Sequence, residues 1–147
     1  MRHRLPRPGP LLVGALLGVP TIGAAGIPAD RVPTPRPEPC IPFNADPAEG
    51  EMAAPAGLGY DAVRSALNGV IKYALYCGQP AGMSQVDMTF ELMVGCNGVV
   101  SSVTVADDGR APAGYVSCVK AVIAKADFPP HDWADGFPVT YPVHVAW

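Results

Sequence analysis

The sequence lacks the residue patterns of the common catalytic sites. It has no cysteine or histidine spacing typical of zinc, no glycine-rich phosphate loop and no serine in a nucleophile elbow. Two acidic clusters remain as candidates for a metal or acid–base site; they contain His131, Asp132, Asp135, Asp107 and Asp108. Solvated loop residues are the simpler interpretation of both clusters. We therefore expect a protein that is not an enzyme and that has no cofactor and no metal ligands.

Long apolar runs are also missing. The stretch LLVGALLGV at residues 11–19 is closed by Pro20, whereas a membrane span needs about 20 apolar residues. Three arginines precede this stretch and small residues follow it, which is the pattern of a secretory signal. We expect residues 1–25 to be a signal peptide cleaved after Ala25, the alternative being an uncleaved anchor. The expected location is the periplasm or the exterior.

Basic residues are few. Removing residues 1–25 would leave seven basic residues against 13 acidic ones, a net charge of −6. An acidic surface argues against nucleic acid and anionic lipid as partners. The four cysteines of an exported chain of this size are expected to form two disulfides.

Proline, by contrast, is concentrated near the N-terminus, with 12 of the 18 prolines before residue 58. Such a segment cannot form a helix or a central strand, so residues 26–58 are expected to be an extended, proline-rich linker. A disordered spacer is the simpler reading, and a ligand for a proline-recognising module is the alternative. We expect Cys40 to pin this linker to a folded domain at residues 59–147.

Two helices are predicted in that domain. The first is capped by Asp61 and ends at Gly78 and Pro80, and the second spans residues 113–127 and is stopped by Phe128-Pro129-Pro130. The apolar positions of the first helix are Val63, Leu67, Val70, Ile71, Ala74 and Leu75. Those of the second helix are Tyr115, Val116, Val119, Val122 and Ile123.

Three strands are predicted from alternating apolar residues. The first carries Val86, Met88, Phe90, Leu92 and Val94. Asn97-Gly98 predicts a hairpin with a loop of two or three residues; in the longer version Val94 faces Val100, and a bulge near Ser101 and Ser102 then turns Val103 and Val105 inward. The last strand carries Val139, Tyr141, Val143, Val145 and Trp147, and Pro142 marks it as an edge strand.

The expected fold class is α+β, with two helices packed on one face of a three-stranded antiparallel sheet in the order α-β-β-α-β. This order constrains the disulfides. Cys77 cannot reach Cys96 at the hairpin tip, because the first strand separates them by about 40 Å. We therefore expect Cys77 to pair with Cys118, which leaves Cys40 to pair with Cys96.

The hairpin pattern around Asn97-Gly98 resembles that of TonB C-terminal domains, and the likeness is closest to the AgmX/PglI C-terminal branch. Cys118, Phe128-Pro129 and Tyr141-Pro142 match features of that branch. The resemblance covers roughly residues 60–147. It implies a non-catalytic module of the cell envelope that binds a protein or peptide.

A binding module of this kind could add an extended partner segment to its last strand, although Pro142 removes a donor there. The candidate partner-binding residues are Val143, Val145, Trp147 and Trp133. Both tryptophans have a second interpretation as core residues. The alternative function is a structural, disulfide-stabilised secreted domain without a ligand. The identity of the partner is not encoded in any motif.

Overall fold

The computed structural model describes residues 28–43 and 55–147. The expected signal peptide lies outside these residues. The folded part contains two α-helices, α1 (Tyr60–Ile71) and α2 (Ala113–Ile123), and three strands, β1 (Gln85–Val94), β2 (Val100–Asp107) and β3 (Phe137–Ala146). Two short 3-10 helices accompany them, η1 (Pro28–Arg31) and η2 (Lys72–Cys77).

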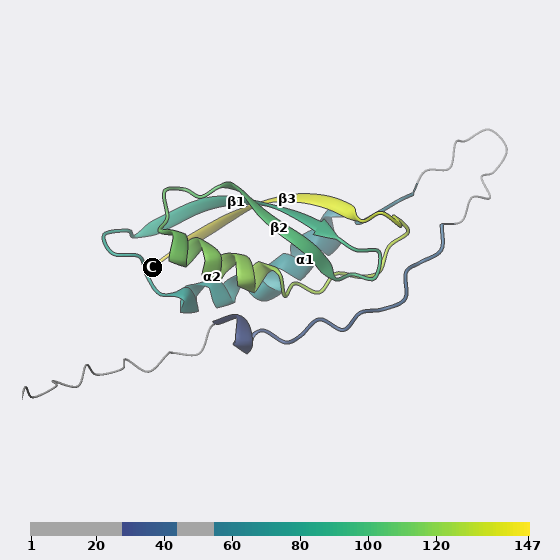
Figure 1. Ribbon diagram of the computed structural model, residues 1–147, viewed down its shortest axis with the longest axis horizontal. Helices are drawn as coiled ribbons and strands as arrows, with labels where there is room; N and C mark the ends of the chain where they lie inside the picture. The colour runs from purple at the N-terminus through teal and green to yellow at the C-terminus, as the bar shows by residue number, and fades with distance from the viewer. Residues whose placement is uncertain (1–27, 44–54) are drawn as a thin grey trace, which may run out of the picture.

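The sheet is antiparallel, with β1 in the centre and the strand order β2-β1-β3. Both helices cover one of its faces (Figure 1), so the predicted α+β architecture is confirmed. The even-numbered residues of β1, from Val86 to Val94, are all buried, and their odd-numbered neighbours are partly or fully exposed. This alternation is the one that a half-buried strand requires.

The hairpin between β1 and β2 has the longer of the two predicted loops. Gly95 N–H donates to the Val99 carbonyl (2.8 Å), and Val94 faces Val100. Gly98 has a φ of +80°, and a Cβ on it would collide with the Phe128 carbonyl. The register skips Ser101, as predicted. It also skips Ala106, and this second bulge was not predicted. The broken alternation of this region is thus a turn followed by two bulges.

The boundaries of both helices differ from the predictions. The N-cap of α1 is Gly59 and not Asp61, which lies in the first turn, where a carboxylate is favoured by the helix dipole. The α-helix ends at Ile71, and the tighter winding of η2 leaves Leu75 exposed. The second helix ends at Ile123, four residues early, because the chain turns there to bury Ala126 and Phe128.

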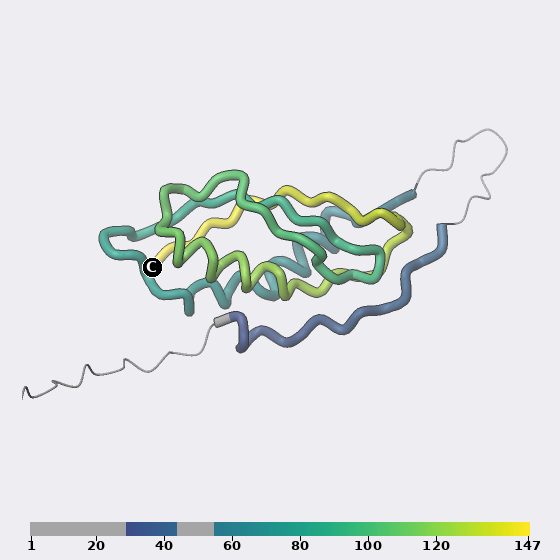
Figure 2. Tube along the Cα trace, in the orientation of Figure 1, coloured from purple at the N-terminus to yellow at the C-terminus, as the bar shows by residue number. Residues whose placement is uncertain are grey.

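The proline-rich residues 28–43, here called the strap, are mostly exposed but contact the folded domain at a few points. Figure 2 shows the strap running alongside the helical layer. Val32 is only 4% exposed and belongs to the core, and Glu38 N–H donates to the Asn97 carbonyl (3.2 Å). A proline-rich segment is already extended, so seating it against the helices costs little conformational entropy. The strap is therefore an extended, mostly exposed segment that is held to the domain at Val32, Glu38 and Cys40.

Both disulfides join the expected cysteines. Cys77 and Cys118 tie η2 to α2, with their Cα atoms 5.8 Å apart. Cys40 and Cys96 tie the strap to the hairpin tip, with their Cα atoms 4.9 Å apart. Two such bonds fit an oxidising compartment. In the described ranges, none of the helices has the length and apolarity needed to span a membrane.

Candidate functional site

The two outer edges of the sheet are the places where a further strand could add, and their backbone groups differ. Trp147 N–H donates to the Ser84 carbonyl (3.0 Å). Facing residues in an antiparallel pair alternate between bonded and non-bonded positions. Along the register of β1 and β3, this alternation directs the even-numbered backbone groups of β3 away from the sheet.

The outward positions of β3 include both of its prolines, Pro138 and Pro142. Neither has an N–H to offer, so Thr140 is an isolated donor between them. The edge is also covered from the helical side, where the Tyr141 hydroxyl donates to Asn68 of α1 (3.2 Å) and Val143 is 2% exposed. Prolines at outward positions block strand addition. The β3 edge is therefore blocked up to Pro142, whereas His144 and Ala146 beyond it still turn their N–H groups outward.

The β2 edge is free of proline. Because β1 turns its even-numbered backbone groups toward β3, the residues of β2 opposite them face outward, namely Val103 opposite Leu92 and Val105 opposite Phe90. A bridge between Val99 and Asp127 covers only the start of this edge. In the part of the chain that the structure describes, no strand pairs with the outer side of β2. Between its two bulges, β2 offers a short, regular and unpaired edge.

A groove lies beside this edge. It has a volume of about 510 Å³ and is here called the β2 groove. Its lining residues are Val105, Ala106, Asp107, Asp108, Ala111, Ala113, Val116 and Ser117. Val105 faces the helical side of the sheet but is 36% exposed, so the prediction that it is buried is wrong. Its cross-strand neighbour Phe90 is fully buried, and α2 leaves Val105 uncovered.

The electrostatics of this side are acidic. Residues 85–117, which include β1 and β2, carry four acidic side chains and a single basic one, Arg110. Of these acids only Asp87 has a partner among the described residues that can carry a positive charge, with its Oδ1 2.6 Å from His144 Nδ1. Asp107 and Asp108 accept backbone N–H groups of Gly109 and Arg110 in the turn after β2. Their negative charge is left facing the β2 groove and solvent.

The four predicted partner-binding residues do not form one site. Val143 and Val145 are core residues beneath the helices, so their side chains are not available to a partner. Trp147 is 37% exposed and packs edge-on against Tyr115, with ring centroids 5.5 Å apart; the prediction that it points inward is therefore only partly right. Trp133 contacts Phe137 at the start of β3, roughly 30 Å along the strand from Trp147.

Trp133 belongs instead to a contact that holds residues 55–57, here called the latch. Its indole N–H donates to the Pro55 carbonyl (3.0 Å). The carboxylate of Asp132 accepts the backbone N–H groups of Gly57 (2.9 Å) and Ala56 (3.0 Å), and these bonds hold the pKa of Asp132 below its ordinary value. A Cβ on Gly57 would collide with the Phe137 ring. The latch fixes the chain just before α1.

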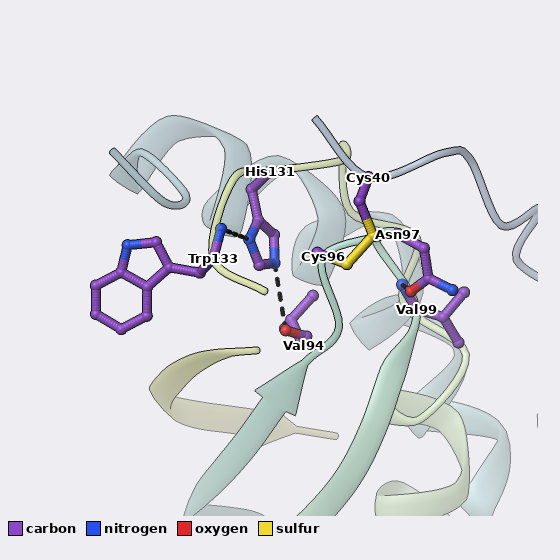
Figure 3. Close-up of a disulfide and its surroundings, with 7 residues drawn as sticks. All are labelled: Cys40, Val94, Cys96, Asn97, Val99, His131 and Trp133. Carbon is purple, nitrogen blue, oxygen red and sulfur yellow. Dashed lines mark hydrogen bonds between the residues drawn. A yellow bond between two sulfur atoms is a disulfide. The ribbon is translucent and has the colours of Figure 1, made fainter. Parts of the chain in front are cut away.

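His131 is buried and fully hydrogen-bonded (Figure 3). Its Nδ1 accepts the Trp133 N–H (3.2 Å), so its Nε2 carries a proton and donates to the Val94 carbonyl (3.2 Å). Both ring nitrogens are therefore committed to backbone groups beside the Cys40–Cys96 bond. This arrangement assigns His131 a structural role at the hairpin tip.

The two acidic clusters lie at opposite ends of the sheet. Asp107 ends β2, whereas Asp132 lies beside the hairpin tip where β2 begins, about 25 Å away at the rise of a strand. Within the described ranges, no three metal-ligating side chains gather in one place. The structure therefore does not combine the clusters into one site.

Sequence reasoning missed the β2 groove. Its apolar members are small, and none stands out in the sequence. One signal was present, since the turn residues after Asp107 delay the start of α2 and leave the end of β2 without a helix above it. No protein-family model, curated protein or solved structure matches the chain.

Proposed function

We propose that the domain at residues 59–147 is a non-enzymatic, protein-binding module of an exported envelope protein, of the TonB or AgmX/PglI C-terminal type. It would hold a partner by accepting one extended segment at a sheet edge. The sequence resemblance and the α-β-β-α-β order support this proposal. The two disulfides support export to an oxidising compartment.

The observation that carries the proposal is the state of the β2 edge. Its outward backbone groups at Val103 and Val105 have no partner strand in the described part of the chain, and the β2 groove, lined by apolar and acidic residues, lies alongside them. Natural sheets usually protect such edges, as the prolines of β3 do here. An edge left open beside a groove offers both main-chain hydrogen bonds and a seat for alternate side chains.

A photo-crosslinking residue placed at Thr104 or at Thr140 tests the proposal with a built-in control. Both threonines lie opposite Glu91 and both are exposed, but Thr104 is on β2 and Thr140 on β3. We expect a discrete adduct with an envelope protein from Thr104 and little from Thr140. Absence of an adduct at both positions in the native envelope would overturn the proposal.

The alternative is a structural secreted domain without a ligand. The disulfides, the strap and the latch favour it, because all three hold the chain rigid without forming a site. The two functions differ in one observable. A structural domain would leave the β2 edge equally accessible to solvent in the cell and in the purified state, whereas a binding module would show a covered β2 edge in the cell.

A further inference from the structure

We infer that the segment accepted at the β2 edge alternates apolar residues with lysine or arginine. This inference rests on the proposed function and names the chemistry of its partner. It follows from three features of the same surface: the unpaired edge, the β2 groove and the carboxylates around it.

The edge determines the backbone of the partner. Ser102 to Val105 are paired with β1 without interruption between the bulges at Ser101 and Ala106. Only an extended chain can use the outward groups of Val103 and Val105, because successive outward groups on a strand are two residues apart. The regular stretch is short, so the added strand would also be short and its binding weak and rapidly reversible.

The groove determines the first set of side chains. An added strand points every second side chain toward the helical side of the sheet. There it would meet Val105, Ala111 and Val116. Residues of valine or isoleucine size would cover the exposed side of Val105 and contact the first half of α2. The inward positions of the partner are therefore apolar.

The charges of this surface determine the second set of partner side chains, those that point to the outer face of the sheet. Asp107 and Asp108 lie at the end of the groove, and Glu91 lies on the outer face next to Thr104. Among the described residues none of these three carboxylates has an ionic partner. The nearest cations are Arg110 in the turn after β2 and Lys120, one helical turn after the groove residues Val116 and Ser117, and neither forms an ion pair with these carboxylates. A cationic segment complements this surface, and an acidic one is repelled.

A second copy of this chain fits the surface less well. Two β2 edges pairing with each other would offer no cation to Asp107 and Asp108 of either copy, so these carboxylates would stay uncompensated at the interface. The β2 strand carries no lysine or arginine to offset them. A cationic partner is therefore favoured over self-pairing.

The test uses three short, end-blocked peptides that alternate valine with lysine, threonine or glutamate. Each is titrated into the isotope-labelled, disulfide-intact chain while backbone amide signals are followed by NMR. We expect the valine–lysine peptide to shift the amides of Val103 and Val105 and to bind about tenfold more tightly than the valine–glutamate peptide. Added salt should reduce this difference.

Two matched variants isolate the charges. Asp107→Asn with Asp108→Asn keeps the side-chain acceptors of the turn but removes two charges, and it should weaken lysine-peptide binding about five- to tenfold. Asp61→Asn with Asp135→Asn removes two exposed charges elsewhere and should change binding less than about twofold.

The outcomes separate the inference from the proposed function. Equal binding of all three peptides at Val103 and Val105 would overturn the inference and leave strand addition standing. Shifts confined to β3, or self-association through β2 without peptide, would overturn the choice of partner and edge. No shift at either edge with any peptide would overturn both.

Discussion

The two edge strands, β2 and β3, flank the same central strand but differ in burial and in the residues at their outward positions. Val143 of β3 and Val105 of β2 both face the helical layer, yet the first is 2% exposed and the second 36%. The outward positions of β3 include two prolines, and those of β2 include none. The β3 edge is thus covered by a helix and blocked by proline up to Pro142, and the β2 edge is free of proline and lies beside a groove.

The largest expected effect is on stability. Val143→Ala should lower the free energy of unfolding by about 2 kcal/mol, because it removes buried methyl groups and leaves a cavity. Val105→Ala should cost less than about 1 kcal/mol, because its side chain is already partly in water. Chemical denaturation of both variants measures the difference. Equal losses would show that the β2 groove is closed in solution and would break the comparison.

The second prediction concerns self-association, where we expect a smaller effect from unblocking the β3 edge. Pro142→Val restores an outward N–H next to Thr140 and should increase self-association through β3. Sedimentation velocity over a range of protein concentrations measures this change. Thr140→Val is the matched control, since it adds apolar surface on the same strand without adding a donor. Unchanged association in Pro142→Val would show that the proline does not protect this edge.

The end of β3 provides a third comparison, because Trp147 could be a lid on Tyr115 or a free anchor. Burial raises the pKa of Tyr115 to about 12, and its hydroxyl has no hydrogen-bond partner among the described residues. Trp147→Ala should lower this pKa toward its ordinary value of 10.0. Ultraviolet titration of tyrosinate, with Tyr60→Phe to remove an exposed tyrosine, checks it. An unchanged Tyr115 titration would mean that Trp147 is not a lid.

The pH dependence of this group has a defined sign. The pKa of Tyr115 is higher in the folded chain than in the unfolded one. Its contribution to folding stability is therefore fully present below pH 10.0 and is lost as the pH rises toward about 12. Alkaline destabilisation in that interval should therefore be smaller in Trp147→Ala.

The smallest expected effect concerns the latch at the start of β3. The pKa of Asp132 is lowered by the N–H groups of Gly57 and Ala56, so the stabilisation it gives is present above its ordinary value of 3.8 and is lost as the pH falls through its folded value. The NMR amide shifts of Ala56 and Gly57 should titrate with a midpoint below 3.8, and Asp132→Asn should abolish this titration. The amide shifts of β2 should not change with pH over the same range. A midpoint at or above 3.8 would contradict the latch.

Local patterns predicted much of this fold. The alternation in β1 gave all five buried positions, because a central strand under two helices has one face fully covered. Asn97-Gly98 predicted the hairpin, and the odd offset after it predicted the bulge at Ser101. Strand order then excluded a Cys77–Cys96 bond by distance alone. These features depend on nearest neighbours in the chain or in the sheet.

Other features depend on contacts between distant segments and were missed. The exposure of Val105 depends on where α2 begins above β2, and the seat of Val32 depends on a strap that only the folded helices can hold. The latch joins Asp132 to an amide 75 residues away in the sequence. Periodicity carries no information about such pairs. The sequence therefore pointed to β3, whereas the proline-free edge beside a groove is on β2.

The central claim is that the open β2 edge is the binding edge, and the most direct measurement exchanges the prolines between the two edges. Val105→Pro removes an outward N–H without breaking a bond to β1, and Pro142→Val restores one on β3. Each variant carries the photo-crosslinking residue at Thr104 and is expressed in cells that have the native envelope. The account predicts that Val105→Pro abolishes the Thr104 adduct and that Pro142→Val preserves it. An adduct that survives Val105→Pro would contradict the account.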